Sequence, residues 1–433
     1  MSDARELCRA MFDAAVARAQ PAICLPPHFP PPPAGRLIVL ACGKAGALMA
    51  EAAERHYLDG GLLPPARLEG ICVTRHGHGR PLRRIRCIEA GHPVPDDASV
   101  SGTEAALALA ATAGPDDLAL VLISGGGSAN WTAPLPPLGL AGKQGLTRAL
   151  LRSGAPIGDI NVVRKHLSRI KGGRLAAKLR ASRTMSLVMS DVPGDELSII
   201  ASGPTVPDES TAADARAVLA RWGIEPTPEV AAVLSDPQSE TPKPGDPAFE
   251  RAEYRLVARP ADSLEAAAAL ARARGYEVEH LGDALEGEAW VLGEAHARLA
   301  IAAHKAGRRI AFLSGGELTV TVTGSGRGGP NQEYALAAAI ALAGTPGISG
   351  LAADSDGIDG GSGAPTDPAG AHFDWTTARR AATLHLNPAA FLKNNDATQF
   401  FSMIGDSLTT GPTGTNVNDF RCVVVDNRNF VAQ

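Results

Sequence analysis

Two glycine-rich segments in the first half of this chain follow apolar runs and carry residue types that bind anions. Lys44 stands between Gly43 and Gly46, directly after the run 36–43. A lysine at a helix start, beside open backbone N–H groups, is a typical phosphate or carboxylate ligand. The second segment comprises Ser124, Gly125, Gly126, Gly127 and Ser128, and such glycines let the backbone approach a ligand closely. We expect an oxyanion at these loops; the alternative is two flexible turns with a solvated lysine.

A basic segment lies further along the first half. Residues 161–173 read NVVRKHLSRIKGG, with Arg164, Lys165, His166, Arg169 and Lys171 close together and no acid among them. A basic helical face is most often simply solvated. The missing acids and the paired glycines that follow predict instead a clamp for a phosphate or carboxylate group.

Acidic loops supply candidates for a metal ion. Asp191 and Asp195 lie in the loop SDVPGDE that follows the apolar run 184–189, and one or two carboxylates with waters suffice for Mg²⁺. The alternative is an Asp-rich turn capped by its own side chains. Asp354, with Asp356 and Asp359, resembles part of a calcium loop, but no glutamate completes the pattern.

The second half adds polar residues around further glycines. Glu317 follows Ser314-Gly315-Gly316, while Arg327, Asn331 and Gln332 lie in the segment 324–333, GSGRGGPNQE. This segment formally matches GxGxxG, but it does not follow the first strand of a βαβ unit, so it is weak support for dinucleotide binding.

The elements that must position these loops alternate between strand and helix. Short apolar runs at 36–43, 68–75, 117–126 and 184–192 predict strands, and the stretches 44–57, 96–111, 143–153 and 173–181 predict helices. Runs of this kind are typical of parallel strands buried on both faces of an α/β domain. After a polar, Pro-rich segment at 236–250, strands are predicted at 255–260, 276–282, 308–316, 318–324 and 348–357, and helices at 262–274, 287–306 and from 330. We therefore predict two α/β domains, residues 1–240 and 250–433.

Composition excludes several classes of function. The net charge is −5, from 41 basic and 46 acidic residues, and aromatic residues make up 4%, which argues against nucleic acid or an anionic membrane as partner. No apolar run reaches the roughly 20 residues of a membrane helix, and the first 20 residues read as an amphipathic helix without a signal core. The six cysteines form no CxxC pair, as expected for reduced thiols in a cytoplasmic protein.

Taken together, the motifs resemble those of the glycerate 2-kinase family whose second half is called the MOFRL domain. The resemblance runs in order along nearly the whole chain. It rests on the segments GKA (43–45), EAGHPVPD (89–96), SGGGS (124–128), RKHLS (164–168), KGG (171–173), SDVPGD (190–195), ASGPT (201–205), SGGE (314–317), GGPNQE (328–333), DSDGIDG (354–360) and TGPTGTNVND (410–419).

The resemblance implies a Rossmann-like domain followed by a smaller α/β domain, and ATP-dependent phosphorylation of D-glycerate at its 2-hydroxyl with Mg²⁺. Some members are labelled hydroxypyruvate reductases, which is the rival function. The predicted catalytic residues are Lys44, Asp191 and Arg327, the metal ligands are Asp191, Asp195 and Asp354, and the substrate or phosphate ligands are residues 124–128, Arg164, Lys165, Lys171, Glu317, Asn331 and Gln332. The residues leave open which loops hold ATP and which hold glycerate, and whether the protein is a homodimer.

Overall fold

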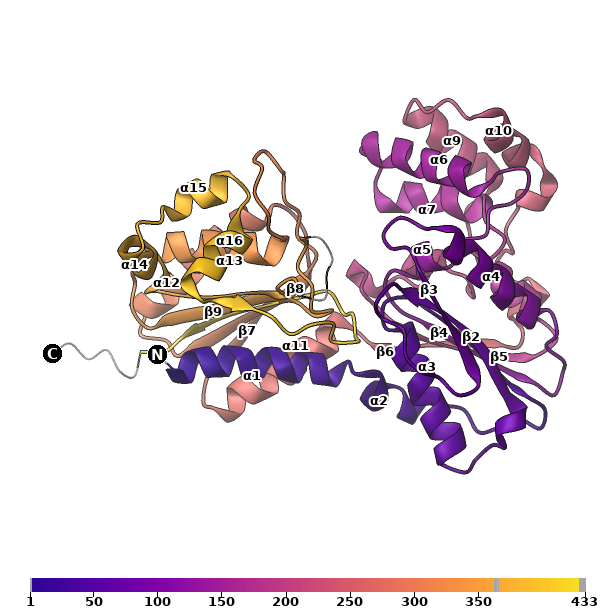
Figure 1. Cartoon of the computed structure of the whole chain (residues 1–433), viewed down its shortest axis with the longest axis horizontal. Coiled ribbons are helices and arrows are strands. Elements are labelled where there is room, and N and C mark those ends of the chain that lie inside the picture. The colour runs from indigo at the N-terminus through magenta and orange to yellow at the C-terminus, as the bar shows by residue number, and fades with distance from the viewer. Residues whose placement is uncertain (1, 362–363, 365, 428–433) are drawn as a thin grey trace. The chain divides into compact units, whose positions relative to one another are not determined.

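The computed structural model describes residues 2–427 except 362, 363 and 365, and it divides the chain into two compact units (Figure 1). The parallel-sheet unit comprises residues 21–190 and 195–257. The mixed-sheet unit comprises residues 191–194 and those from 258 onward, together with the first 20. The domain boundary predicted from the linker at 236–250 stays a prediction.

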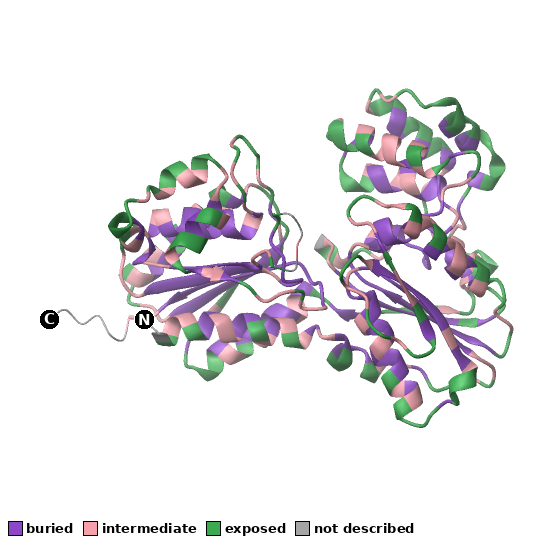
Figure 2. Cartoon of the chain, in the orientation of Figure 1, coloured by how far each residue is buried: buried purple, intermediate pink, exposed green. Residues whose placement is uncertain are grey.

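The parallel-sheet unit is built on six strands in the order β3-β2-β1-β4-β5-β6. Their bounds are β1 Leu37–Cys42, β2 Leu68–Arg75, β3 Ile85–Ala90, β4 Leu118–Ile123, β5 Arg183–Met189 and β6 Ala252–Ala258. All pairings among β1 to β5 are parallel, as the apolar runs predict. Every residue of β1 and β4 is buried, because helices and loops cover both faces of the sheet (Figure 2). The edge strand β3 was not predicted, since its sequence IRCIEA is partly exposed and carries charges.

Helices of this unit fall into two groups. Those next to the sheet are α2 Pro21–Cys24, α3 Gly46–Glu54, α4 Asp97–Ala110, α5 Gly127–Asn130 and α8 Arg174–Leu179. The others are α6 Leu140–Arg152, α7 Ile157–His166, α9 Ala212–Arg221 and α10 Pro228–Ser235. This second group lies beyond α5 (Figure 1) and has an apolar core of its own, which includes Leu150, Val163 and Val218.

The mixed-sheet unit contains a second sheet in the order β11-β10-β9-β12-β8-β7. Its strands are β7 Glu277–Leu285, β8 Ile310–Gly316, β9 Ile348–Asp354, β10 Gly370–Asp374, β11 Ser407–Leu408 and β12 Asp419–Val425. Its helices are α1 Ser2–Arg18, α11 Pro260–Ala273, α12 Ala289–Lys305, α13 Pro330–Leu342, α14 Thr377–Thr383, α15 Pro388–Lys393 and α16 Ala397–Ile404. β7 pairs with β8 in parallel, and the other pairings are antiparallel.

Helices cover both faces of this second sheet (Figure 1). α1 and α11 share one apolar cluster with the sheet, and α12, α13 and α16 share another. α13 is buried almost all round, so it has no polar face. No described helix is both long enough and apolar enough to span a bilayer.

The strand predicted at 318–324 is wrong. This segment is extended and largely exposed, and only Thr319 forms an isolated bridge. The N–H groups of Thr323 and Gly324 donate to Asn395 Oδ1 at 2.8 and 2.9 Å. The alternating sequence LTVTVT fits a strand, but here a side chain takes the place of a neighbouring strand as hydrogen-bond partner.

Candidate active site

The loops after β1 and β4 meet at the point where the strand order of the parallel sheet reverses. β2 and β3 lie on one side of this point, and β5 and β6 lie on the other. Ligands of open parallel sheets bind in the crevice beyond the carboxyl ends of such strands. Lys44 is the second residue after β1, and Ser124 follows β4 directly. The fold therefore places the two glycine-rich loops where a ligand site is expected.

Backbone hydrogen bonds hold the two loops together. The Lys44 N–H donates to Gly125 O at 2.8 Å, and the Ala45 N–H donates to Ser124 Oγ at 3.0 Å. Gly43 has a φ of +101°, and a Cβ there would lie 2.4 Å from Ser124 O. This position requires glycine, because a side chain would separate the loops.

Three cations gather beside the loop after β4. Lys171 is fully buried, and its Nζ donates to Ser128 O at 2.9 Å. Burial, together with the positive charges of Lys143 and Arg164, lowers the pKa of Lys171 well below its usual value. Burial likewise lowers the pKa of Arg164. Two of the predicted ligands, Arg164 and Lys171, are thus brought together next to Ser128.

Lys143 is the third cation, and its sequence motif did not mark it as a ligand. It lies on α6 with 7% of its surface exposed, and its Nζ donates to Thr132 Oγ1 at 3.0 Å. Burial and the charge of Arg164 lower its pKa to about 7. The only local signal was Gly142-Lys143, which Gln144 follows where a P-loop has Ser or Thr.

No carboxylate among the described residues forms an ion pair with any of these three cations. Burying like charges without a counter-ion costs several kcal/mol per charge. A bound oxyanion would remove this cost. The arrangement is therefore suited to a phosphate or carboxylate ligand.

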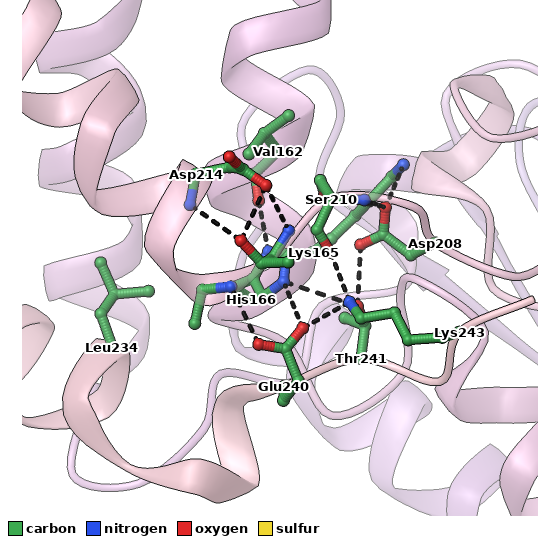
Figure 3. Close-up of polar contacts among 12 residues, drawn as sticks. Val162, Lys165, His166, Asp208, Ser210, Asp214, Leu234, Glu240, Thr241 and Lys243 are labelled. Carbon is green, nitrogen blue, oxygen red and sulfur yellow. Dashed lines mark hydrogen bonds and ion pairs between the residues drawn. The ribbon is translucent and has the colours of Figure 1, made fainter.

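Lys165, in contrast, already has an anionic partner. Its Nζ donates to Asp208 Oδ1 at 3.2 Å, and both side chains are buried. Asp208 also accepts hydrogen bonds from Ser210 and Thr241, at 2.8 and 3.0 Å (Figure 3). The neighbouring His166 lies 3.5 Å from Glu240 Oε1 and does not point to the cation cluster. In this structure the charge of Lys165 is used to hold the C-terminal end of α7 to the segments 208–210 and 240–243.

We expect Asp208→Asn to lower the free energy of unfolding at neutral pH by about 3 kcal/mol, because it leaves Lys165 as an unpaired buried charge. Burial acts to raise the pKa of Asp208, but the Lys165 ammonium and the Ser210 bonds hold it below its ordinary value. The stabilising effect is therefore present above about pH 4 and is lost as the pH falls through the folded-state pKa. Urea unfolding at several pH values measures this. The double variant Lys165→Met/Asp208→Asn should lose less free energy of unfolding than the two single variants lose in sum. Strict additivity of the two losses would contradict the pairing.

The two aspartates predicted to share a metal ion belong to different units. Asp191 belongs to the mixed-sheet unit, where its Oδ2 accepts from Asn416 at 2.8 Å and its backbone O accepts from Asn418 at 3.0 Å. Asp195 belongs to the parallel-sheet unit and adopts a φ of +56°. Its Oδ1 is buried and has no hydrogen-bond partner among the described residues.

Asn331 and Gln332 bind a carboxylate of the protein itself. Asp359 accepts from both backbone N–H groups, at 3.0 and 2.8 Å, and from both side-chain amides, each at 3.1 Å. It thereby caps the first turn of α13. Asn331 Nδ2 also donates to Asp419 Oδ1 at 2.7 Å. Burial and the charge of Asp419 raise the pKa of Asp359 to about 7.

The remaining predicted residues lie near this same edge of the mixed sheet. Glu317 follows β8 and is exposed, and Asp354 ends β9, where its Oδ1 accepts from the Asp356 N–H at 2.8 Å. Arg327 is exposed and lines a cavity of about 270 Å³ together with Asp359 and Asp367. Within the described part of the chain, no three His, Cys, Asp or Glu side chains gather as a metal site.

Comparison with known proteins identifies the family. Residues 7–235 match the domain of unknown function DUF4147, and residues 310–419 match the MOFRL family. An Agrobacterium vitis protein with the provisional name hydroxypyruvate reductase is 45% identical over 98% of this chain and 94% of its own length. The D-glycerate 2-kinase of Thermotoga maritima is 40% identical over 89% of both chains.

A solved structure supports the same assignment. The crystal structure of glycerate kinase (EC 2.7.1.31) from Thermotoga maritima has a TM-score of 0.88 to this chain and 37% sequence identity, and the match covers 98% of this chain and 100% of that one. Fold, domain composition and sequence identity agree along nearly the full length. This chain therefore belongs to the glycerate 2-kinase family of DUF4147–MOFRL proteins.

Proposed function

We propose that this protein transfers the γ-phosphoryl group of ATP to the 2-hydroxyl of D-glycerate, giving 2-phosphoglycerate and ADP. The observation that carries the proposal is the cluster of Lys143, Arg164 and Lys171 beside the loop 124–128. Both lysines are buried and Arg164 is partly buried, and no carboxylate of the described residues forms an ion pair with them. Phosphoryl transfer depends on positioning and charge neutralisation more than on covalent chemistry. The kinases named among the relatives support this reaction.

The proposed site residues divide this work. Lys44 and the N–H groups of residues 124–128 bind phosphate oxygens at the strand ends. Arg164 and Lys171 balance the charge of the carboxylate or of the group in transfer, and their burial excludes water that would weaken the interaction. Arg327 of the mixed-sheet unit is proposed to bind a further phosphate oxygen. Asp191 is proposed to orient the 2-hydroxyl and accept its proton.

Mg²⁺ is proposed as the ion that accompanies ATP. It usually binds phosphate oxygens and water with only one or two carboxylates. The partnerless Oδ1 of Asp195 is a suitable donor atom for it, and Asp191 and Asp354 are the other proposed ligands. When bound, the ion would neutralise charge on the phosphate groups.

The rival reaction is NAD(P)H-dependent reduction of hydroxypyruvate, after which one of the relatives is named. The geometry gives it little support. The GxGxxG match lies in the mixed-sheet unit and packs against the turn at 394–396. A Cβ on Gly324 would lie 2.3 Å from Asn394 O, and one on Gly326 would lie 2.3 Å from Asp396 Cβ. These glycines are therefore used for packing within the protein, not to approach a pyrophosphate.

Two assays on the purified protein test the proposal. We expect ADP release that depends on D-glycerate, and no NADPH oxidation with hydroxypyruvate. Phosphorus NMR of the product should show 2-phosphoglycerate. NADPH oxidation without ADP release would establish the reductase instead, and a 3-phosphoglycerate signal would overturn the assigned hydroxyl.

A further inference from the structure

Lys143 is placed by a chain of hydrogen bonds that leads to the loop after β4. Its Nζ donates to Thr132 Oγ1 at 3.0 Å, and this hydroxyl donates in turn to Ala129 O at 3.0 Å. The Thr132 N–H donates to Thr103 Oγ1 on α4 at 2.8 Å. The amine is thus fixed to the end of α5 by a buried threonine, and is not a flexible surface group.

The charged groups that face Lys143 are cations. Arg164 comes from α7, and Lys171 comes from the segment before α8. The Cys42 thiol at the end of β1 faces Lys171, and burial raises the pKa of this thiol, so that it stays neutral. Among the described residues no Asp or Glu pairs with the Lys143 amine. A buried ammonium here lacks the counter-charge that structural lysines such as Lys165 have.

We propose that Lys143 is a third ligand, with Arg164 and Lys171, for one oxyanion of the substrates, and that its amine takes up a proton from solvent when that oxyanion binds. The inference rests on the anion site of the proposed function and adds to it both a residue and a proton linkage. The oxyanion is a phosphate group of ATP or the carboxylate of glycerate.

The direction of the proton linkage follows from charge. Without a ligand, burial and Arg164 hold the pKa of Lys143 at about 7. An anion within hydrogen-bond distance favours the ammonium and raises this pKa. At about pH 8.5 most free molecules would then hold a neutral amine and most complexes an ammonium, so binding takes up close to one proton. At about pH 5.5 the amine is already charged, and the uptake from this group falls towards zero.

Isothermal titration calorimetry in buffers of different ionisation enthalpy measures this uptake directly. The probes are D-glycerate, a non-hydrolysable ATP analogue and inorganic phosphate, each titrated separately at about pH 5.5 and 8.5. The probe whose binding depends on Lys143 identifies the source of the oxyanion. We expect Lys143 to contribute about 0.5 to 1 proton to the uptake by the wild-type protein at the higher pH with that probe, in addition to any uptake by Lys171.

Two substitutions separate charge from protonation. Lys143→Met should weaken binding of that probe by about 10- to 100-fold, because a charge-assisted hydrogen bond is lost. It should also remove the part of the proton uptake that Lys143 supplies, while Lys171, whose pKa burial also lowers, still supplies its own part. Lys143→Arg stays charged, so it should retain part of the affinity. It should lose as much of the proton uptake as Lys143→Met does, because an arginine does not change its protonation state. Lys178→Met on α8, a substitution of an exposed lysine in the same unit, should behave as wild type. Circular dichroism verifies that each variant is folded.

Unchanged affinity and unchanged proton uptake in folded Lys143→Met, for all three probes, would overturn the inference. The test of Lys143 can fail without the kinase reaction failing, and the reverse also holds. If wild-type protein makes 2-phosphoglycerate and Lys143→Met binds and reacts equally well, only the role of Lys143 is wrong. If no ADP is released but phosphate binding still depends on Lys143, the anion site stands and the kinase reaction is wrong.

Discussion

Lys171→Met is expected to lower kcat/KM for D-glycerate by about 10³-fold. Loss of one preorganised electrostatic donor typically costs about 10²- to 10³-fold, and Lys171 is fully buried, where charge interactions are strong. Its Nζ also fixes Ser128 O at 2.9 Å, so the loop after β4 loses an anchor. Steady-state kinetics on the purified variant measure the effect, and a loss of less than about tenfold would contradict a direct role.

Stability separates this role from a structural one. When Lys171 is protonated in the absence of a ligand, it is a buried cation beside Lys143 and Arg164, so replacing it with an apolar side chain of similar size should not destabilise the fold. Burial and the neighbouring cations lower the pKa of Lys171. At low pH the protonated lysine is therefore less stable in the folded protein than in the unfolded chain, and it lowers the free energy of unfolding of the wild type. Any gain in unfolding free energy in Lys171→Met should therefore be largest well below the folded-state pKa and disappear near about pH 10.5. A variant that is inactive because it is unfolded would show the opposite: a large drop in melting temperature.

Lys44→Ala is expected to lower kcat by about 10²-fold or more, the usual effect of removing one electrostatic contact to the reacting group. Lys44 follows β1 at the switch point of the sheet, and its backbone is locked to Gly125. Its Cγ lies 3.4 Å from the point that a Cβ of Gly126 would occupy, so the side chain runs beside the loop after β4. The backbone bond does not depend on the side chain, so the loop should keep its conformation in the variant.

Lys44→Arg serves as the matched control for Lys44→Ala. It keeps the charge but changes the donor geometry, so we expect partial activity between wild type and Lys44→Ala. Lys178→Ala, on an exposed lysine of α8, should leave kcat unchanged. Near wild-type kcat in folded Lys44→Ala would show that this lysine does not contact the reacting phosphate.

The sequence by itself determined the α/β class of the parallel-sheet unit, its central strands and the loops that carry the chemistry, but not the edge strand β3. Continuous apolar runs such as 36–43 and 117–126, which are short and end in glycine or serine, predict strands buried on both faces, and they become β1 and β4. Glycine and lysine directly after such runs mark strand ends, which is why Lys44 and residues 124–128 could be named in advance. Family motifs in order along the chain determined the family, because they need no tertiary information.

Only the tertiary structure decided which charges are available for a ligand. Lys165 and Lys171 are alike in the sequence, but Asp208 neutralises the first, and no described carboxylate pairs with the second. Asn331 and Gln332 are likewise engaged by Asp359. Lys143 joined the site only because Thr132 and α7 lie beside it. The reason is physical: apolar periodicity is local along the chain, whereas the charge state of a buried group depends on residues distant in sequence that folding brings within a few ångströms.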